Sequence, residues 1–335
     1  MIEPLKTASA SLANHSGLLD SYAFLRRKFT KSQVAILLYH RICPQKYTWS
    51  LKPFSPQIFQ SQLEYLCRNY EILPLDSLVQ YIRQGRSLPE KAAVITFDDG
   101  YKDNYLYAYP ILKKHHAPAT IFLTTGHIGT GELFWFDKVK YAIQHSSVDR
   151  LELDELGIHT LQADIDKNRV KFIIKKLKNL PEGEKQLLIQ KLLNLCQVNI
   201  PPGLGKELIL SWDEVREMHS NGISFGAHSV SHPILTNLPL EQARNEIIQS
   251  KKDIEEKLGQ DVTAFSYPNG DFNAEIIELL RESSFTCAVT CVHRLISPKT
   301  NPYQLCRILV SQDFNKFKLA LSWLYHDLGL NRLSE

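Results

Sequence analysis

Short apolar runs alternate with amphipathic helical patterns along most of this chain, and this alternation limits the possible folds more than any other feature. Several of the runs are continuously apolar, which is typical of strands that are covered on both faces. The runs lie at residues 34–39, 70–73, 94–97, 120–124, 223–227, 263–267, 286–290 and 307–310. Strands that are separated by helices predict a parallel sheet with the helices packed outside it.

Capping residues mark the starts of several predicted helices. Ser55 and Pro56 are typical of an N-cap and the first helical residue. Ser211 with Glu214 matches a capping box, and Asn273 is a further N-cap. The predicted helices cover residues 56–69, 75–84, 105–115, 212–221, 239–258 and 274–282. Seven or eight strand–helix units favour a barrel over an open sheet.

The alternation stops between residues 131 and 205. Three helical patterns follow one another there, at residues 137–145, 167–180 and 182–196. We therefore predict a helical insertion at 131–205 that packs beside a barrel formed by residues 33–130 and 206–325. Residues 1–32 are predicted to form a separate N-terminal helical segment.

Composition and charge exclude some classes of protein. The net charge is only +3, and the sequence has no Lys/Arg stripe of the kind that binds nucleic acid. No signal-peptide pattern and no apolar stretch of membrane-spanning length is present, although the mildly amphipathic segment 18–29 leaves peripheral membrane contact open. Without a C-x-x-C pair, the six cysteines are interpreted as reduced thiols in a cytoplasmic protein.

A pair of adjacent carboxylates ends one of the buried runs. Residues 92–100 read AAVITFDDG, so Asp98 and Asp99 follow directly after the predicted strand. Two like charges side by side oppose each other's ionisation, and a bound cation would relieve that repulsion. One carboxylate could then bind a metal while the other acts as a base. The alternative is a polar turn with an Asx cap, which is common.

Two histidines follow another predicted strand. Residues 224–233 read SFGAHSVSHP, and Pro233 biases His232 away from helical dihedral angles. His228 and His232 are therefore expected in a loop at the end of a strand. Two imidazoles and one carboxylate, with a position open for water, make a catalytic site of the zinc type. The alternative is a pair of structural histidines.

Two further segments end predicted strands in the same way. Residues 265–270 read FSYPNG, a turn that can direct backbone N–H groups at a developing oxyanion, and His40 closes the first run. Taken alone, each segment is more often structural than catalytic. All four segments, however, lie at the carboxyl ends of predicted parallel strands. This is the face where β/α barrels have their active sites, so the sequence predicts one shared site.

Residues 96–100 (TFDDG) and 228–233 (HSVSHP) resemble two motifs of the polysaccharide deacetylase family, carbohydrate esterase family 4 with the NodB-homology domain. The resemblance covers about residues 33–130 and 206–312. It implies a distorted (β/α)7 barrel and a divalent metal, usually zinc. It also implies Asp98 as general base, metal binding by Asp99, His228 and His232, and an oxyanion contact from the backbone N–H of Asn269.

The sequence departs from the family pattern at later motifs. Residues 266–269 read SYPN where the family often has Arg-x-Pro-Tyr, and residues 307–311 offer no histidine as general acid. We predict His40 as the proton donor, with His293 as second choice. In the family the missing arginine often contacts the base, and Arg307 is expected to replace it. Tyr267 and Arg307 are also candidate substrate-binding residues.

The predicted function is hydrolytic removal of the acetyl group from an N-acetylated sugar of a polysaccharide, oligosaccharide or glycolipid precursor. The variant motifs are similar to those of exopolysaccharide and glycolipid deacetylases. One alternative is a metal-dependent amidohydrolase that acts on a non-sugar amide, and another is a carbohydrate-binding protein without catalysis. The ligand set also accepts cobalt, nickel or manganese, and the sequence carries no signal for oligomeric state.

Overall fold

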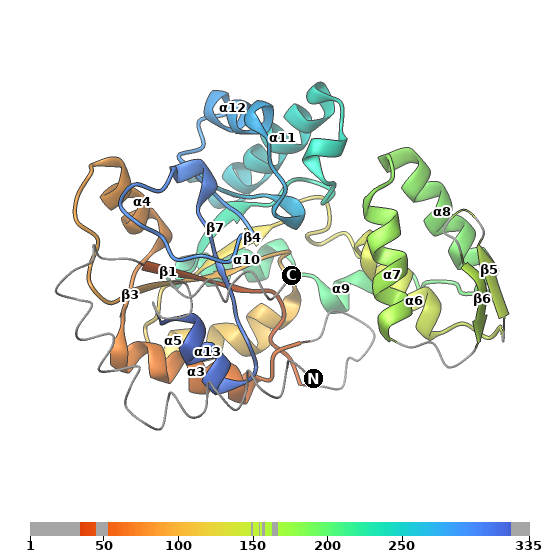
Figure 1. Cartoon of the computed structure of the whole chain (residues 1–335), viewed down its shortest axis with the longest axis horizontal. Helices are drawn as coiled ribbons and strands as arrows, with labels where there is room; N and C mark the ends of the chain where they lie inside the picture. Colours follow the sequence, from red (N-terminus) through yellow and green to blue (C-terminus); the bar gives the residue numbers. More distant parts are fainter. Residues whose placement is uncertain are drawn as a thin grey trace.

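The structure is a computed structural model, which describes residues 34–44, 53–148, 150–153, 155, 158–162 and 167–322. Figure 1 shows a curled sheet wrapped by helices, with the segment around α6, α7 and α8 set beside it. The predicted N-terminal helical segment, residues 1–32, lies outside the described residues, as do residues 323–325 of the predicted barrel.

In the described part of the chain, eight strands form one parallel sheet. They are β1 (Val34–Tyr39), β2 (Glu71–Ile72), β3 (Ala92–Phe97), β4 (Thr120–Leu123), β7 (Ser224–Ala227), β8 (Ala264–Ser266), β9 (Cys287–Val289) and β10 (Ile308–Leu309). Seven of them follow the order β10-β1-β3-β4-β7-β8-β9, and β2 pairs with the start of β3. The eight predicted runs are thus confirmed as strands, with ends that differ by one or two residues.

The sheet curls until its two outer edges meet. Leu305, just before β10, donates its N–H to the carbonyl of Ala288 in β9 at 2.9 Å. Its own carbonyl accepts a hydrogen bond of 2.8 Å from the N–H of Thr290. The β10 edge is thereby joined to the β9 edge. The predicted distorted barrel is confirmed, and its carboxyl ends all open to one side.

Helices cover the outside of this barrel. They are α3 (Pro56–Asn69), α4 (Leu75–Arg83), α5 (Tyr109–Lys114), α10 (Trp212–Ser220), α11 (Leu240–Leu258), α12 (Ala274–Glu282) and α13 (Phe314–Ala320). Single 3-10 turns are η3 (Leu235–Asn237), η4 (Pro268–Gly270) and η5 (Pro302–Gln304). The predicted capping box opens α10: Ser211 Oγ accepts from Glu214 N at 3.3 Å, and Glu214 Oε2 accepts from Ser211 N at 2.8 Å.

The prediction of a single helix at residues 105–115 was wrong. A π-helical turn, η1 (Asn104–Ala108), precedes α5 instead. Pro110 has no N–H to donate to the preceding turn, so the regular α-helical ladder is interrupted at that point.

The segment 131–205 contains α6 (Trp135–Gln144), α7 (Lys167–Lys178), α8 (Glu182–Leu195) and the start of α9 (Gly205–Leu208). It also contains an antiparallel pair of strands, β5 (Arg150–Leu153) and β6 (Ile158–Gln162). The prediction of a purely helical insertion was wrong there. Leu151 and Leu153 alternate with charged residues, a period of two that is typical of a strand and that helical spacing elsewhere in the segment obscured.

Two expectations from composition can be compared with the structure. All six cysteines are free thiols, so no disulfide contributes to the fold. None of the helices in the described ranges is both long and apolar enough to cross a bilayer.

The interior of the barrel is tightly filled where β4 and β7 lie side by side. A Cβ atom at Gly226 would lie 2.6 Å from the ring of Phe122 and 2.8 Å from the carbonyl oxygen of Ala264. We expect Gly226→Ala to lower the free energy of unfolding by about 2 kcal/mol, because a well-packed core resists an added methyl group. Urea denaturation measures this loss. Gly183→Ala is the control: its Cβ would meet nothing within 4 Å, so its stability should be unchanged or slightly higher.

Candidate active site

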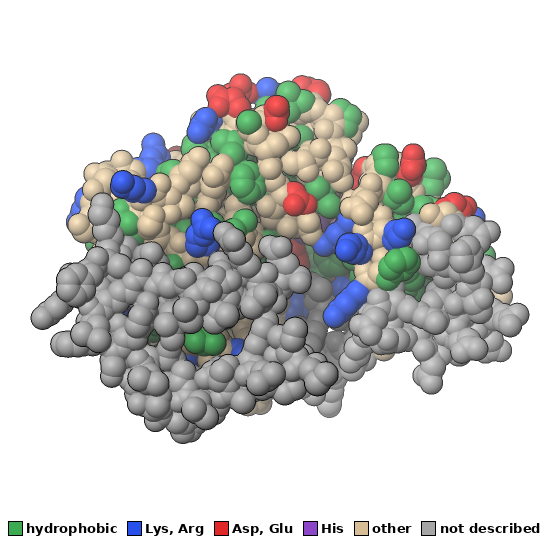
Figure 2. All heavy atoms as spheres, in the orientation of Figure 1, with side chains coloured by type: hydrophobic (Ala, Val, Ile, Leu, Met, Phe, Trp, Pro, Cys, Tyr) green, Lys and Arg blue, Asp and Glu red, His purple; other side chains and the backbone are tan. Residues whose placement is uncertain are grey.

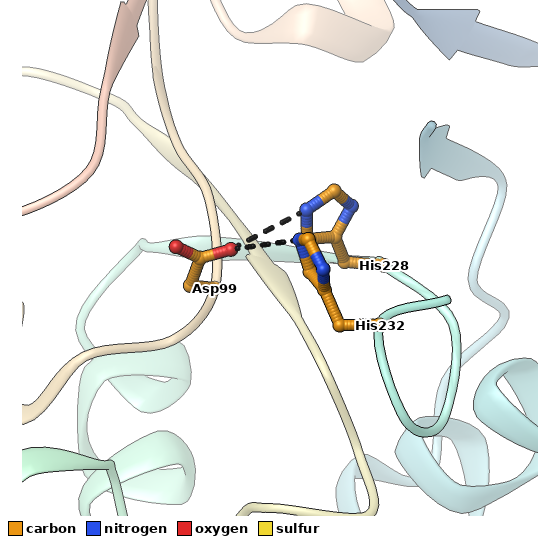
Figure 3. A group of neighbouring side chains, drawn as sticks. All are labelled: Asp99, His228 and His232. Atoms are coloured by element: carbon orange, nitrogen blue, oxygen red, sulfur yellow. Dashed lines mark ion pairs between the residues drawn. The ribbon is translucent and has the colours of Figure 1, made fainter. Parts of the chain in front are cut away.

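Three side chains converge at the carboxyl ends of β3 and β7. Asp99 follows β3, while His228 and His232 belong to the loop after β7 (Figure 3). Asp99 Oδ1 lies 3.5 Å from Nε2 of His228 and 3.4 Å from Nε2 of His232. One ligand atom from each residue lies within 4.8 Å of the others. The structure therefore brings together the three residues for which the sequence predicted a shared metal.

The orientation of His228 fits a metal ligand. Its Nδ1 lies 2.7 Å from the carbonyl oxygen of Ser266, which fixes the proton on Nδ1. The lone pair of Nε2 then faces Asp99. Burial alone would raise the pKa of Asp99, but the two imidazoles outweigh it and hold that pKa well below its ordinary value. An ionised carboxylate and two oriented imidazoles form a donor set that suits a divalent transition metal.

The loop that carries the histidines is held in an unusual backbone conformation. Ser229 and His232 have positive φ angles of 62° and 61°, in the left-handed region that non-glycine residues seldom occupy. The carboxylate of Glu246 on α11 accepts hydrogen bonds from the backbone N–H of Val230, at 2.7 Å, and of Ser231, at 2.9 Å. Ser229 Oγ accepts from His232 N at 3.0 Å. These bonds oppose the strain and keep His232 turned toward Asp99.

Aromatic rings from the start of the insertion pack against His232. The ring of Phe134 lies 5.8 Å and the ring of Phe136 5.4 Å from the imidazole, both nearly perpendicular to it. Such edge-to-face contacts hold the imidazole in place and keep its surroundings apolar. The insertion thus forms one wall of the site.

Asp98 is held by a buried arginine. Arg307 Nη1 donates to Asp98 Oδ1 at 2.7 Å and Nη2 to Oδ2 at 2.6 Å, a bidentate pair inside the barrel. Ser266 Oγ also donates to Oδ2, at 3.2 Å. Burial alone would raise the pKa of Asp98, but the charges of Arg307 and His228 hold it below its ordinary value. Asp98 is therefore an ionised, oriented proton acceptor.

Two predicted substrate contacts need correction. Arg307 and Tyr267 are both 0% exposed, so neither side chain can touch a sugar at the mouth of the barrel. Arg307 instead makes the contact with Asp98 that was expected of the missing arginine. The hydroxyl of Tyr267 donates to the carbonyl of Tyr303 at 2.9 Å, so this residue supports the wall of the barrel. Neighbouring residues of a strand face opposite sides, which explains why Ser266 rather than Tyr267 reaches Asp98.

The other predicted residues lie around this centre. His40 follows β1, is half-buried, and its charge acts on the carboxylates of both Asp98 and Asp99. His293 lies in the loop after β9. Asn269, in η4, has a positive φ of 61°. The proton-donor role of His40 or His293 stays a prediction.

Several residues that build the site were not predicted from the sequence. The hydroxyl of Ser266 was visible in the SYPN segment but was not assigned a role. Phe134 and Phe136 lie at the start of the predicted insertion, but neither was assigned a role. Lys178, at the end of α7, had no signal at all, because a lysine in a lysine-rich helix is usually solvated.

A curled parallel sheet that brings one carboxylate and two imidazoles together beside a second, ionised carboxylate is the framework of a metal-assisted hydrolase. Within that class, the chain belongs to the polysaccharide deacetylase family, whose model matches residues 85–288. The resemblance carried by residues 96–100 and 228–233 is thereby confirmed.

Individual relatives agree with this assignment. The chain is 29% identical over 234 residues to a poly-beta-1,6-N-acetyl-D-glucosamine N-deacetylase of Staphylococcus epidermidis, covering 59% of this chain and 73% of that protein. It is 24% identical over 293 residues to the Bacillus subtilis protein YxkH, covering 87% and 76% of the two chains. Among solved structures, the Streptococcus pyogenes deacetylase PplD matches with a TM-score of 0.59 at 21% identity, covering 88% of this chain and 99% of PplD. That structural match supports the fold.

Proposed function

We propose that this protein is a metal-dependent hydrolase that removes the acetyl group from an N-acetylated sugar. The observation that carries the proposal is the convergence of Asp99, His228 and His232 beside the arginine-held carboxylate of Asp98. Two adjacent carboxylates thus have different surroundings and different roles. One faces the imidazoles and completes a metal-binding set, and the other remains available for proton transfer.

The proposed reaction consumes one water and releases acetate and a free sugar amine. A divalent ion held by Asp99, His228 and His232, for which zinc is the expected identity, would polarise the acetyl carbonyl and lower the pKa of water. Asp98 takes the proton from the attacking water, and Arg307 keeps Asp98 ionised and correctly oriented. The backbone N–H of Asn269 has no acceptor among the described residues, so it is available to the developing oxyanion.

The proton that the leaving nitrogen needs is assigned to His40. This histidine closes β1 on the open face of the barrel, and its charge reaches both carboxylates. His293 remains the second choice. A neutral amine is a far better leaving group than an amide anion, so one of the two must deliver a proton as the carbon–nitrogen bond breaks.

Relatives suggest the substrate class. Two staphylococcal relatives are named as poly-beta-1,6-N-acetyl-D-glucosamine N-deacetylases. We therefore infer that an N-acetylhexosamine of an exopolysaccharide, or of its precursor, is the substrate of this chain. A cytoplasmic location is part of the proposal, and it favours precursors assembled inside the cell.

Metal removal tests this function directly. Dialysis against a chelator should abolish acetate release from N-acetylglucosamine oligomers, and stoichiometric zinc should restore it. Zinc should also raise the melting temperature of the chelated protein, because an ion that binds only the folded state stabilises it.

The variant His228→Ala is the control, since it should show neither zinc-dependent stabilisation nor activity. Acetate release that survives complete metal removal would contradict the proposal. Release from non-sugar amides alone would favour a different amidohydrolase.

A further inference from the structure

The insertion reaches the active site through Lys178, the last residue of α7. The Nζ of Lys178 donates a hydrogen bond to Oδ1 of Asn269, the residue proposed to face the oxyanion. The backbone carbonyl of Lys178 accepts a hydrogen bond of 3.2 Å from Nδ2 of Asn237. One residue of the insertion thus touches the barrel at two separate points.

Both contact points belong to loops that build the site. Asn237 ends η3, only five residues after His232, and Asn269 lies at the centre of η4, directly after β8. The carbonyl of Lys178 would otherwise lack a partner at the end of its helix, so the bond from Asn237 satisfies both groups. Lys178 is therefore a bridge between the histidine loop and the Pro268–Gly270 turn.

The turn around Asn269 needs such support. Asn269 has a φ of 61°, and a left-handed conformation of this kind costs a non-glycine residue roughly 1 kcal/mol. Its side chain is held at both ends, because its Nδ2 also donates to Asp271 Oδ2 at 2.6 Å. Gly270 packs so closely that a Cβ there would lie 2.6 Å from the Cβ of Cys291. Close packing against Cys291 holds the turn at Gly270. The hydrogen bond from Lys178 holds it at Asn269.

The surroundings of Lys178 differ from those of the other lysines on its helix. Lys178 is half-buried, and burial lowers its pKa, which the charges of Cys291, Asp271 and Asp99 oppose. Lys175, one turn earlier on α7, is exposed. Figure 2 shows Lys and Arg side chains gathered over α7. Lys178 differs from Lys175 in that it donates a hydrogen bond to a residue of the site.

We propose that Lys178 is a positioning residue of the deacetylase site, which acts by holding Asn269 so that its backbone N–H can receive the oxyanion. This inference rests on the proposed function. It also gives the insertion a defined role: in addition to forming a wall with Phe134 and Phe136, the insertion fixes the geometry of a loop that the barrel alone leaves strained.

The test compares Lys178→Met with the matched control Lys175→Met. Lys178→Met should lower kcat by about 10-fold to 100-fold with little change in KM. This reduction in kcat is smaller than the one expected from loss of an oxyanion donor itself. Lys175→Met should behave as wild type. Lys178→Arg keeps a cationic donor and should recover most of the activity. If Lys178→Met does not fold, Lys178→Gln takes its place.

A double-mutant cycle separates positioning from direct substrate contact. If Lys178 acts through Asn269, adding Lys178→Met to Asn269→Ala should lower kcat no more than about twofold further. Multiplicative losses would mean that Lys178 contacts the substrate itself, and the positioning role would then be wrong.

Hydrogen exchange gives a readout that does not depend on activity. The backbone amides of residues 267–272 should exchange faster in Lys178→Met than in wild type. Their exchange in Lys175→Met should equal that of the wild type. Unchanged exchange in both variants would overturn the inference, even if the enzyme is an active deacetylase. If the wild-type protein releases no acetate, the proposed function fails, but the exchange measurement still decides whether Lys178 holds the turn.

Discussion

Asp98→Asn is expected to lower kcat for acetate release by about 10²-fold to 10⁴-fold, the usual contribution of a positioned general base. The amide cannot take a proton from the attacking water at neutral pH. Zinc should remain bound at one ion per chain, because Asp99, His228 and His232 are unchanged. Acetate release from N-acetylglucosamine oligomers and metal analysis of the same sample measure the two effects together.

Asp213→Asn is the matched control, because this side chain is 89% exposed on α10 and is not one of the proposed site residues. Its activity should equal that of the wild type. An Asp98→Asn variant with more than a tenth of wild-type activity would show that Asp98 is not the base. Loss of zinc from that variant would instead show that Asp98 is a metal ligand.

Arg307→Met is expected to lower the free energy of unfolding by about 3–5 kcal/mol, the typical cost of leaving one buried charge without its partner. Arg307 is 0% exposed and Asp98 is 2% exposed, so water cannot replace the lost guanidinium. The pKa of Asp98 should also rise, because burial is then opposed only by weaker charges. The acid limb of the pH–activity profile should therefore move to higher pH.

Two comparisons show whether the loss comes from the uncompensated charge. Arg281→Met removes an exposed ion pair with Glu278, for which a change of at most about 1 kcal/mol is expected. The double variant Asp98→Asn/Arg307→Met should be more stable than Arg307→Met alone, since it buries no unpaired charge. Urea denaturation of the four proteins measures this difference. Equal stability of the single and double variants would contradict the electrostatic explanation.

Local patterns in the sequence were enough to predict the barrel and the centre of its site. Each strand is a short apolar run, and each key residue follows such a run within a few positions. Parallel strands place their carboxyl ends on one face, so the sequence alone groups Asp98, Asp99, His228 and His232 at one site. The hairpin β5–β6 escaped prediction because its short period-two pattern lies between longer helical ones.

Local patterns do not predict contacts between distant segments, and Arg307 was expected near the base only from the family resemblance. Arg307 lies 209 residues from Asp98, and Lys178 lies 91 residues from Asn269. Arg307 meets Asp98 because the sheet closes on itself, and Lys178 meets Asn269 because the insertion packs beside the barrel. No local propensity encodes such a meeting.

Whether a feature of this protein could be predicted from the sequence therefore depends on how far apart in the chain its residues lie. The spacing of apolar and polar residues along the chain predicts which side chains lie at the open face of the barrel. Long-range packing decides which neighbour each of them has, and so which of the two adjacent carboxylates is paired with a buried arginine. Arg307 and Tyr267 were expected to contact the sugar, but closure of the sheet buries both side chains. They support the barrel from inside instead.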